Sequence, residues 1–190
     1  MAANPAPKIS AAEYLARDAS ATFRSEYYAG EAFAMSGGKP AHAQLILQFG
    51  RALEDALEDG PCVVTVSDLR LQVKANETYV YPDGMVVCGG FALAEGRQDT
   101  ITNPVVVVEV LSESTEAWDR GGKFALYQGV ETLREYVLVS TTAMRVEWFT
   151  REGQGDWRYR AAEGPGAVVR LDGLAVTLDL EGIYRKVVLG

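Results

Sequence analysis

The alternation of hydrophobic and polar positions at the start of the chain predicts a short helix followed by an extended segment. Residues 10–25 begin with Ser10 and carry Glu13 three positions later, which is the spacing of a helix capping box. Residues 26–35, EYYAGEAFAM, alternate loosely around Gly30. That pattern favours a hairpin or a bent strand.

A longer amphipathic helix is expected over residues 40–58. Its apolar positions recur at helical spacing, while charged side chains occupy the other faces. These apolar positions are Ile46, Phe49, Leu53 and Leu57. The helix should end before the Gly60-Pro61 pair, because proline and glycine interrupt helices.

The middle and the end of the chain have mainly the pattern of strands. Residues 62–73, CVVTVSDLRLQV, are β-branched and partly alternating, which predicts a strand with a kink near Ser67-Asp68. The segment 74–79, KANETY, is expected to be a turn. Further strands are expected directly after Asp83 and over 104–111 and 135–140, with a second helix over 119–129 and Gly-linked hairpins over 145–184.

One of these strands carries a carboxylate within a run of valines. The sequence VVVVEV is typical of a strand buried on both faces of a sheet, and Glu109 interrupts it. Burying an unpaired charge is so unfavourable that Glu109 needs a cation, a metal ion or a shifted pKa. Asp83, which opens the preceding apolar run, is a candidate for the second half of such a site.

Composition restricts the class of protein. The 190 residues suffice for one core, and we expect a single domain over 1–190 with 1–9 flexible. No stretch approaches the roughly 18 consecutive apolar residues of a membrane span, and the N-terminus lacks a basic segment followed by an apolar one. A cytoplasmic protein without membrane contact is therefore expected. The net charge of −8 argues against coating nucleic acid by bulk electrostatics, although a local basic groove is still compatible.

The two cysteines carry no recognisable chemistry. Cys62 and Cys88 fit no metal-ligand spacing, and a chain with a single histidine argues against a Cys/His zinc site. We expect both thiols to be reduced and packed in the sheet, because cysteine behaves as a small hydrophobic residue in cores.

The order helix, strand, strand, carboxylate-bearing strand, helix, strand resembles the core of the PD-(D/E)xK nucleases. The chain is more specifically similar to the Uma-two family of restriction endonuclease-like proteins. The residues that carry this resemblance are Pro82-Asp83, VVVVEVLSEST, Asp119, Lys123, Tyr127, GVETLREYVLVS and the N-terminal EYYAGEAFAMSGGKPAH. The resemblance implies an α/β fold with a mixed sheet, a restriction-endonuclease-like core and additional C-terminal β-hairpins.

The chain departs from the usual nuclease pattern at one position. A lysine normally lies two residues after the second acid, and Leu111 occupies that position here. The resemblance implies that the lysine has moved onto the following helix, which makes Lys123 the candidate. Asp83 and Glu109 would then supply hard oxygen ligands to Mg²⁺ or Mn²⁺, and the resemblance adds the carbonyl of Val110. A bound metal activates water, while a lysine offsets the charge that builds on a phosphate.

Each of these residues also has a simpler interpretation. Asp83 is part of Pro-Asp-Gly, a common turn sequence. Glu109 could pair with an arginine such as Arg70. Asp119 could cap the second helix, and Lys123 could be an exposed partner of Asp119 one turn away.

Three residues of the N-terminal segment match the family's opening signature: Glu26, Glu31 and His42. An acid from this region could complete the metal shell or hold the attacking water. The sequence does not choose among them. Because His42 precedes the apolar stripe of the long helix, a packed, hydrogen-bonded histidine is the alternative.

These observations favour a Mg²⁺-dependent endonuclease that cuts DNA, acting as a homodimer since two strands need two sites. A non-catalytic nucleic-acid- or protein-binding module on the same fold is the alternative, supported by the acidic charge and the missing motif lysine. A structural or regulatory dimer is a third. Residues 145–160 interleave arginines with aromatic residues, which could contact a nucleic-acid backbone, form a dimer surface, or belong to a hairpin with one solvated face.

Overall fold

The computed structural model describes residues 8–35, 37–73, 77–153 and 155–190. A six-stranded mixed sheet forms its centre, with the strand order β11-β10-β9-β8-β6-β3. Only β8 and β9 run parallel within it. The strands are β3 (Cys62–Val66), β6 (Gly84–Cys88), β8 (Val106–Val110), β9 (Glu135–Val139), β10 (Arg145–Glu152) and β11 (Asp156–Glu163).

The valine strand β8 lies inside this sheet, as its sequence predicts. All five of its residues are buried, and its valines alternate between two separate hydrophobic clusters. Val108 and Val110 face the cluster under the long helix, whereas Val107 and Leu111 face the opposite cluster. Strand alternation therefore directs Glu109 to the side of Val107 and Leu111.

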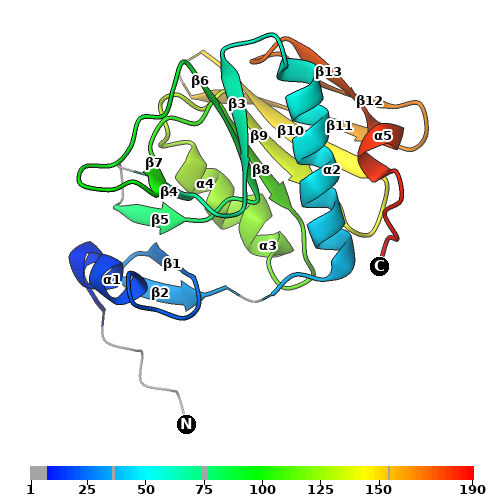
Figure 1. Ribbon diagram of the computed structural model, residues 1–190. Helices are drawn as coiled ribbons and strands as arrows, with labels where there is room; N and C mark the ends of the chain where they lie inside the picture. Colours follow the sequence, from blue (N-terminus) through cyan, green and yellow to red (C-terminus); the bar gives the residue numbers. More distant parts are fainter. Residues whose placement is uncertain (1–7, 36, 74–76, 154) are drawn as a thin grey trace.

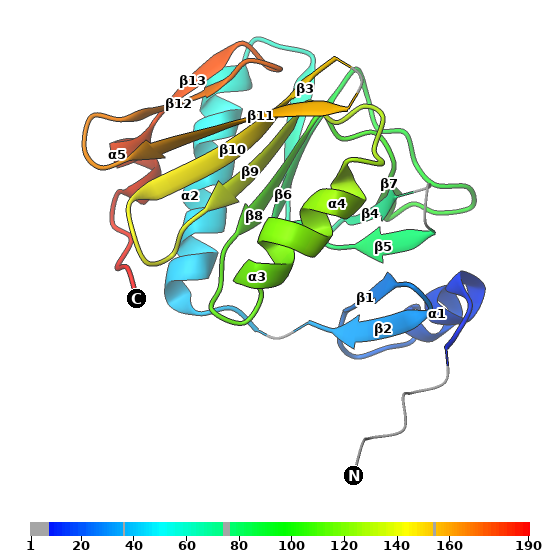
Figure 2. The same ribbon diagram turned by 180° about the vertical axis from the view of Figure 1, so that it is seen from behind.

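Helices cover both faces of the sheet. Figure 1 shows α2 (Pro40–Leu57) across one face, and Figure 2 shows the helical segment α3–α4 across the other. That segment consists of α3 (Glu116–Trp118), a π-helical turn (Asp119–Lys123) and α4 (Phe124–Tyr127). Beside α2 lie β13 (Val176–Asp179) and α5 (Leu180–Tyr184), and β12 (Val168–Leu171) pairs with β13.

The N-terminal strands β1 and β2 join strands from the middle of the chain in a second, smaller sheet, and they lie at the lower left of Figure 1. Its order is β2-β1-β5-β4-β7, from β1 (Ser25–Tyr28), β2 (Glu31–Ala34), β4 (Arg70–Val73), β5 (Thr78–Val80) and β7 (Thr100–Ile101). Helix α1 (Ala11–Asp18) begins with the expected capping box of Ser10 and Glu13. Tyr14, Tyr27 and Tyr79 form the small buried cluster that joins α1 to this sheet.

The structure confirms the expected fold class and corrects several boundaries. The expected strand over 62–73 is two strands, β3 and β4, which belong to different sheets. A break at Ser67, which has a φ of 56°, separates them. The expected turn over 74–79 extends too far, because β5 already begins at Thr78, while 74–76 lie outside the described residues. The short helix α5 replaces the end of the expected C-terminal hairpins.

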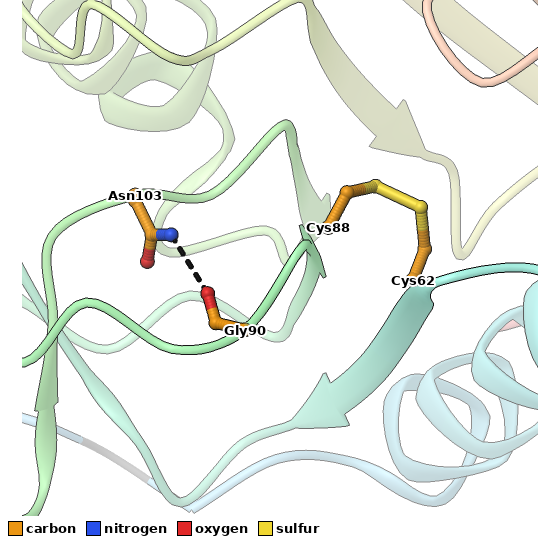
Figure 3. Close-up of a disulfide and its surroundings, with 4 residues drawn as sticks. All are labelled: Cys62, Cys88, Gly90 and Asn103. Atoms are coloured by element: carbon orange, nitrogen blue, oxygen red, sulfur yellow. Dashed lines mark hydrogen bonds between the residues drawn. A yellow bond between two sulfur atoms is a disulfide. The ribbon is translucent and has the colours of Figure 1, made fainter.

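The expectation of two reduced cysteines was wrong. Cys62 and Cys88 are paired neighbours on β3 and β6, with Cα atoms 3.9 Å apart, and their sulfurs form a disulfide (Figure 3). The side chain of Asn103 donates a hydrogen bond to the carbonyl of Gly90 close by, at 2.9 Å. Sequence spacing did not reveal the pair, because 26 positions separate the two cysteines and only the strand register brings them together.

None of the helices in the described ranges is long and apolar enough to cross a membrane. The single-domain organisation over 1–190 stays a prediction. Most of the segment that was expected to be flexible, 1–9, lies outside the described residues. Ile9, which is described, donates its backbone N–H to the carbonyl of Gly30.

Candidate functional site

The candidate site lies where β6 begins beside β8. Gly84 pairs with Val108, so Asp83 precedes the first paired residue of β6 at the level of Glu109. The carboxylate of Asp83 accepts a hydrogen bond from the backbone N–H of Val110, at 2.8 Å. This bond fixes Asp83 against the valine strand, so the turn interpretation of Pro-Asp-Gly does not describe its main contact.

Lys123 reaches the same site from the helical segment. Its side chain is buried, and its ammonium lies 3.0 Å from Glu109 Oε1, 3.2 Å from Glu26 Oε1 and 3.4 Å from Asp119 Oδ1. The three carboxylates come from β8, β1 and the π-helical turn. Lys123 is therefore buried and forms ion pairs with three carboxylates. The interpretation as an exposed partner of Asp119 was wrong.

The π-helical turn is what directs both Asp119 and Lys123 inward. Both residues are buried, although they stand at its first and last positions. Such turns are rare and occur frequently at functional sites. Asp119 does not cap the helical segment, which already begins at Glu116, so the capping interpretation was also wrong.

Glu109 receives a second hydrogen bond from Tyr127. The Tyr127 hydroxyl donates to Glu109 Oε1 at 2.6 Å, the same oxygen that Lys123 contacts. Burial raises the pKa of Glu109 above the usual range of a glutamate, while the ammonium of Lys123 opposes that rise. The alternative pairing with Arg70 does not occur, because Arg70 binds Asp18 and the hydroxyl of Tyr81.

His42, at the start of α2, contacts Asp83 from the other side. Its Nε2 lies 3.2 Å from Asp83 Oδ2. Hydrogen bonding to Asp83 raises the pKa of His42, while burial lowers it. His42 therefore contacts one of the proposed metal ligands, Asp83.

Glu26 and Glu31 have different positions although both match the N-terminal signature. Glu26 Oε1 contacts Lys123 and also accepts the backbone N–H of Tyr81 at 3.1 Å, so it joins the site. Glu31 lies on the fully exposed strand β2, and the structure does not bring it into this group of contacts. The N-terminal acid that reaches the site is Glu26.

The site has more negative than positive groups. Glu26, Glu109 and Asp119 surround the ammonium of Lys123, while Asp83 lies beside His42. Asp119 Oδ1 is buried, it contacts the ammonium of Lys123 at 3.4 Å, and burial raises the pKa of its carboxyl. An additional cation would offset this imbalance.

The donor chemistry suits a hard divalent ion, which needs few protein oxygens because it keeps several waters. Among the described residues, no three His, Cys, Asp or Glu side chains are already grouped to hold a metal ion. Asp83, Glu109 and the carbonyl of Val110 are oxygen donors of the kind that such an ion takes, and the described residues do not form a closed protein cage.

Comparison with known proteins identifies the family. Residues 11–181 match the model of the Uma2 family, described as "Putative restriction endonuclease". The chain belongs to the Uma2 family. It is also 35% identical over 186 residues to one protein of Synechocystis sp. (95% of this chain, 94% of the other) and 34% identical over 161 residues to a second (85% and 91%). Both of these relatives are described as uncharacterized.

A solved structure shares the fold of this Uma2 protein. The crystal structure of "a putative nuclease belonging to DUF820" from Anabaena variabilis superposes with a TM-score of 0.77, covering 95% of this chain and 99% of that one. The sequence identity is 13%, so the likeness concerns the fold alone. It agrees with the restriction-endonuclease-like core that the sequence predicts.

The arginines of the β10–β11 hairpin in this Uma2 protein are already engaged. Arg145 pairs with Glu147 and Glu163, and Arg160 pairs with Asp172. Arg158 pairs with Glu152 and Asp172, while Arg151 lies over the Trp157 ring and donates to backbone carbonyls. These contacts are compatible with a hairpin that has one solvated face, and the nucleic-acid and dimer interpretations stay predictions.

Proposed function

We propose that this Uma2 protein is a metal-dependent endonuclease that hydrolyses phosphodiester bonds in DNA. The observation that carries the proposal is the meeting of Asp83, Glu109 and Lys123 in one buried site, from three segments that are distant in the sequence. The family description and the shared fold support the reaction class.

Asp83, Glu109 and the carbonyl of Val110 would hold Mg²⁺ or Mn²⁺. The ion, when bound, would lower the pKa of a water and withdraw charge from the phosphate. The protein's own groups have separate roles. Lys123 offsets charge on the phosphate, and its position 3.0 Å from Glu109 keeps it at the site. Asp119 and Glu26 hold the lysine in turn.

The test is a pair of isosteric substitutions, Asp83→Asn and Glu109→Gln. Each should abolish Mn²⁺ binding in calorimetric titration and cleavage of plasmid DNA while the circular dichroism spectrum stays native. The matched control is Asp55→Asn, an exposed carboxylate of α2 whose partner is Arg51. Full cleavage by either site variant would refute the proposal.

A non-catalytic nucleic-acid- or protein-binding module is the second candidate. The observation that favours it is that Lys123 and His42 already occupy the carboxylates that a metal would need. Wild-type protein that binds DNA but leaves DNA and RNA intact with Mn²⁺ would favour this function.

We also propose a homodimer, because cutting both strands of a duplex needs two sites. Sedimentation equilibrium of the wild-type protein, with and without a DNA duplex, measures the oligomeric state directly. A monomer under both conditions would restrict the enzyme to nicking one strand at a time.

A further inference from the structure

We propose that Tyr127 is a positioning residue, which orients the Glu109 carboxylate for metal binding. The inference rests on the proposed function and adds a residue to which the sequence motif assigns no role. Tyr127 is fully buried in the hydrophobic cluster on the face of β8 that carries Val107 and Leu111. Its hydroxyl donates a hydrogen bond to Glu109 at 2.6 Å.

Both donors to Glu109 bind the same oxygen. Tyr127 and Lys123 contact Oε1, and within the described part of the chain no hydrogen bond to Oε2 is present. Rotation of this carboxylate about its Cγ–Cδ bond moves Oε1 and would therefore break both hydrogen bonds. The second oxygen is thereby kept for another ligand, which is the arrangement that supporting residues create around metal-binding carboxylates.

The hydroxyl of Tyr127 has no other use in the described structure. The ring packs against Tyr136, with 5.2 Å between centroids, and this contact needs only the aromatic face. A neutral donor is also suited to this place, because the site already contains the ammonium of Lys123 and a second cation would compete with a metal ion. Tyr127 can therefore orient Glu109 without neutralising it.

The chain offers a matched control in Tyr184. This tyrosine is also buried, and its hydroxyl donates to the carbonyls of Ser140 and Arg145, at 2.7 Å each, in a different cluster. Tyr127→Phe and Tyr184→Phe each remove one buried hydroxyl and keep the ring. The two variants differ in whether the lost hydrogen bond served Glu109.

The experiment is a calorimetric Mn²⁺ titration of the wild-type protein and both variants, with thermal unfolding recorded in EDTA. We expect Tyr127→Phe to weaken Mn²⁺ binding by about 10-fold or more, the usual effect of losing a supporting hydrogen bond. Tyr184→Phe should leave the affinity within about 2-fold of wild type, since its bonds lie elsewhere.

Equal Mn²⁺ affinity in Tyr127→Phe and wild type would overturn the positioning role, and so would an equal loss in both variants. A wild-type protein that binds no Mn²⁺ would overturn the inference together with the proposed metal site. The two failures are distinguishable, because the first appears only in the variants and the second already in the wild type.

Discussion

A single buried carboxylate, Glu109, determines much of the chemistry at the residue scale. A charged glutamate in the middle of a buried valine strand destabilises the fold unless other groups compensate its charge. Two hydrogen-bond donors do so here. Lys123 supplies the charge and Tyr127 a neutral hydrogen bond. Lys123 in turn has three carboxylates around it, which raise its pKa against the effect of burial.

Removing Lys123 should therefore be strongly destabilising. We expect Lys123→Met to lower the free energy of unfolding by about 3–5 kcal/mol, because it leaves Glu109 buried without its cation. Urea denaturation at pH 7 in EDTA measures the loss. The double variant with Glu109→Gln should recover part of it, since the uncompensated charge is then gone. A loss below about 1 kcal/mol in Lys123→Met would contradict the stabilising role that we assign to the buried ion pairs of Lys123.

The residue pattern made Asp83 and Glu109 candidates for one site, the family resemblance added Lys123, and the structure places the three close together. They could not separate Glu26 from Glu31, because both lie in the same hairpin and match the same signature. The choice depends on where that hairpin sits, which is fixed by distant contacts such as Tyr28 against Trp118, with centroids 5.5 Å apart. Such long-range contacts cannot be predicted from a single sequence.

At the scale of elements, the π-helical turn joins the N-terminal hairpin to the site. It contains Gly121 and Gly122, whose surroundings differ sharply. A side chain on Gly122 would collide with the indole of Trp118, whereas the space beside Gly121 is open within 4 Å. Gly122 thus lets Trp118 fold back over the turn and contact Tyr28 on β1.

Alanine at these two glycines should have opposite effects. Gly121→Ala should stabilise the protein by about 0.5–1 kcal/mol, because alanine is the better helix former. Gly122→Ala should destabilise it by about 1–3 kcal/mol through the collision with Trp118. Urea denaturation of both variants measures the difference. Combining Gly122→Ala with Trp118→Ala should remove the collision, and the same stabilisation in both single variants would contradict this account.

Periodicity predicted the helices and strands whose patterns are local. Helix α2 and strand β8 match their expected ranges closely, since each buries one continuous stripe or run. The second helix was placed three residues too late, because the Gly-Gly pair and Asp119 resemble a helix start. The π-helical turn has no sequence signature of its own. The family resemblance made Lys123 a candidate, but no pattern indicated that Asp119 is buried beside it.

At the scale of the whole molecule, the register of the central sheet brings together residues that no local pattern connects. The pairing of β6 with β8 places Asp83 near Glu109, and the pairing of β6 with β3 places Cys88 opposite Cys62. The first pair was predicted from the residue pattern and the family resemblance together. The second pair was missed, because the positions of two cysteines in the sequence do not indicate a disulfide unless the strand register is known.

The disulfide links the outer strand β3 to β6, the strand that follows Asp83, and it spans 26 positions. Closing a loop of that size restricts the unfolded chain, so reduction should lower the free energy of unfolding by about 3 kcal/mol. Urea denaturation with and without dithiothreitol measures this. The double variant Cys62→Ser, Cys88→Ser should have the same free energy of unfolding as the reduced wild type, and dithiothreitol should not change it.

Because β3 and β6 remain paired along five positions without the bond, the reduced protein should keep its fold and its Mn²⁺ affinity. Loss of Mn²⁺ binding on reduction, at a urea concentration where the fold persists, would instead mean that the disulfide holds β6 and Asp83 in place.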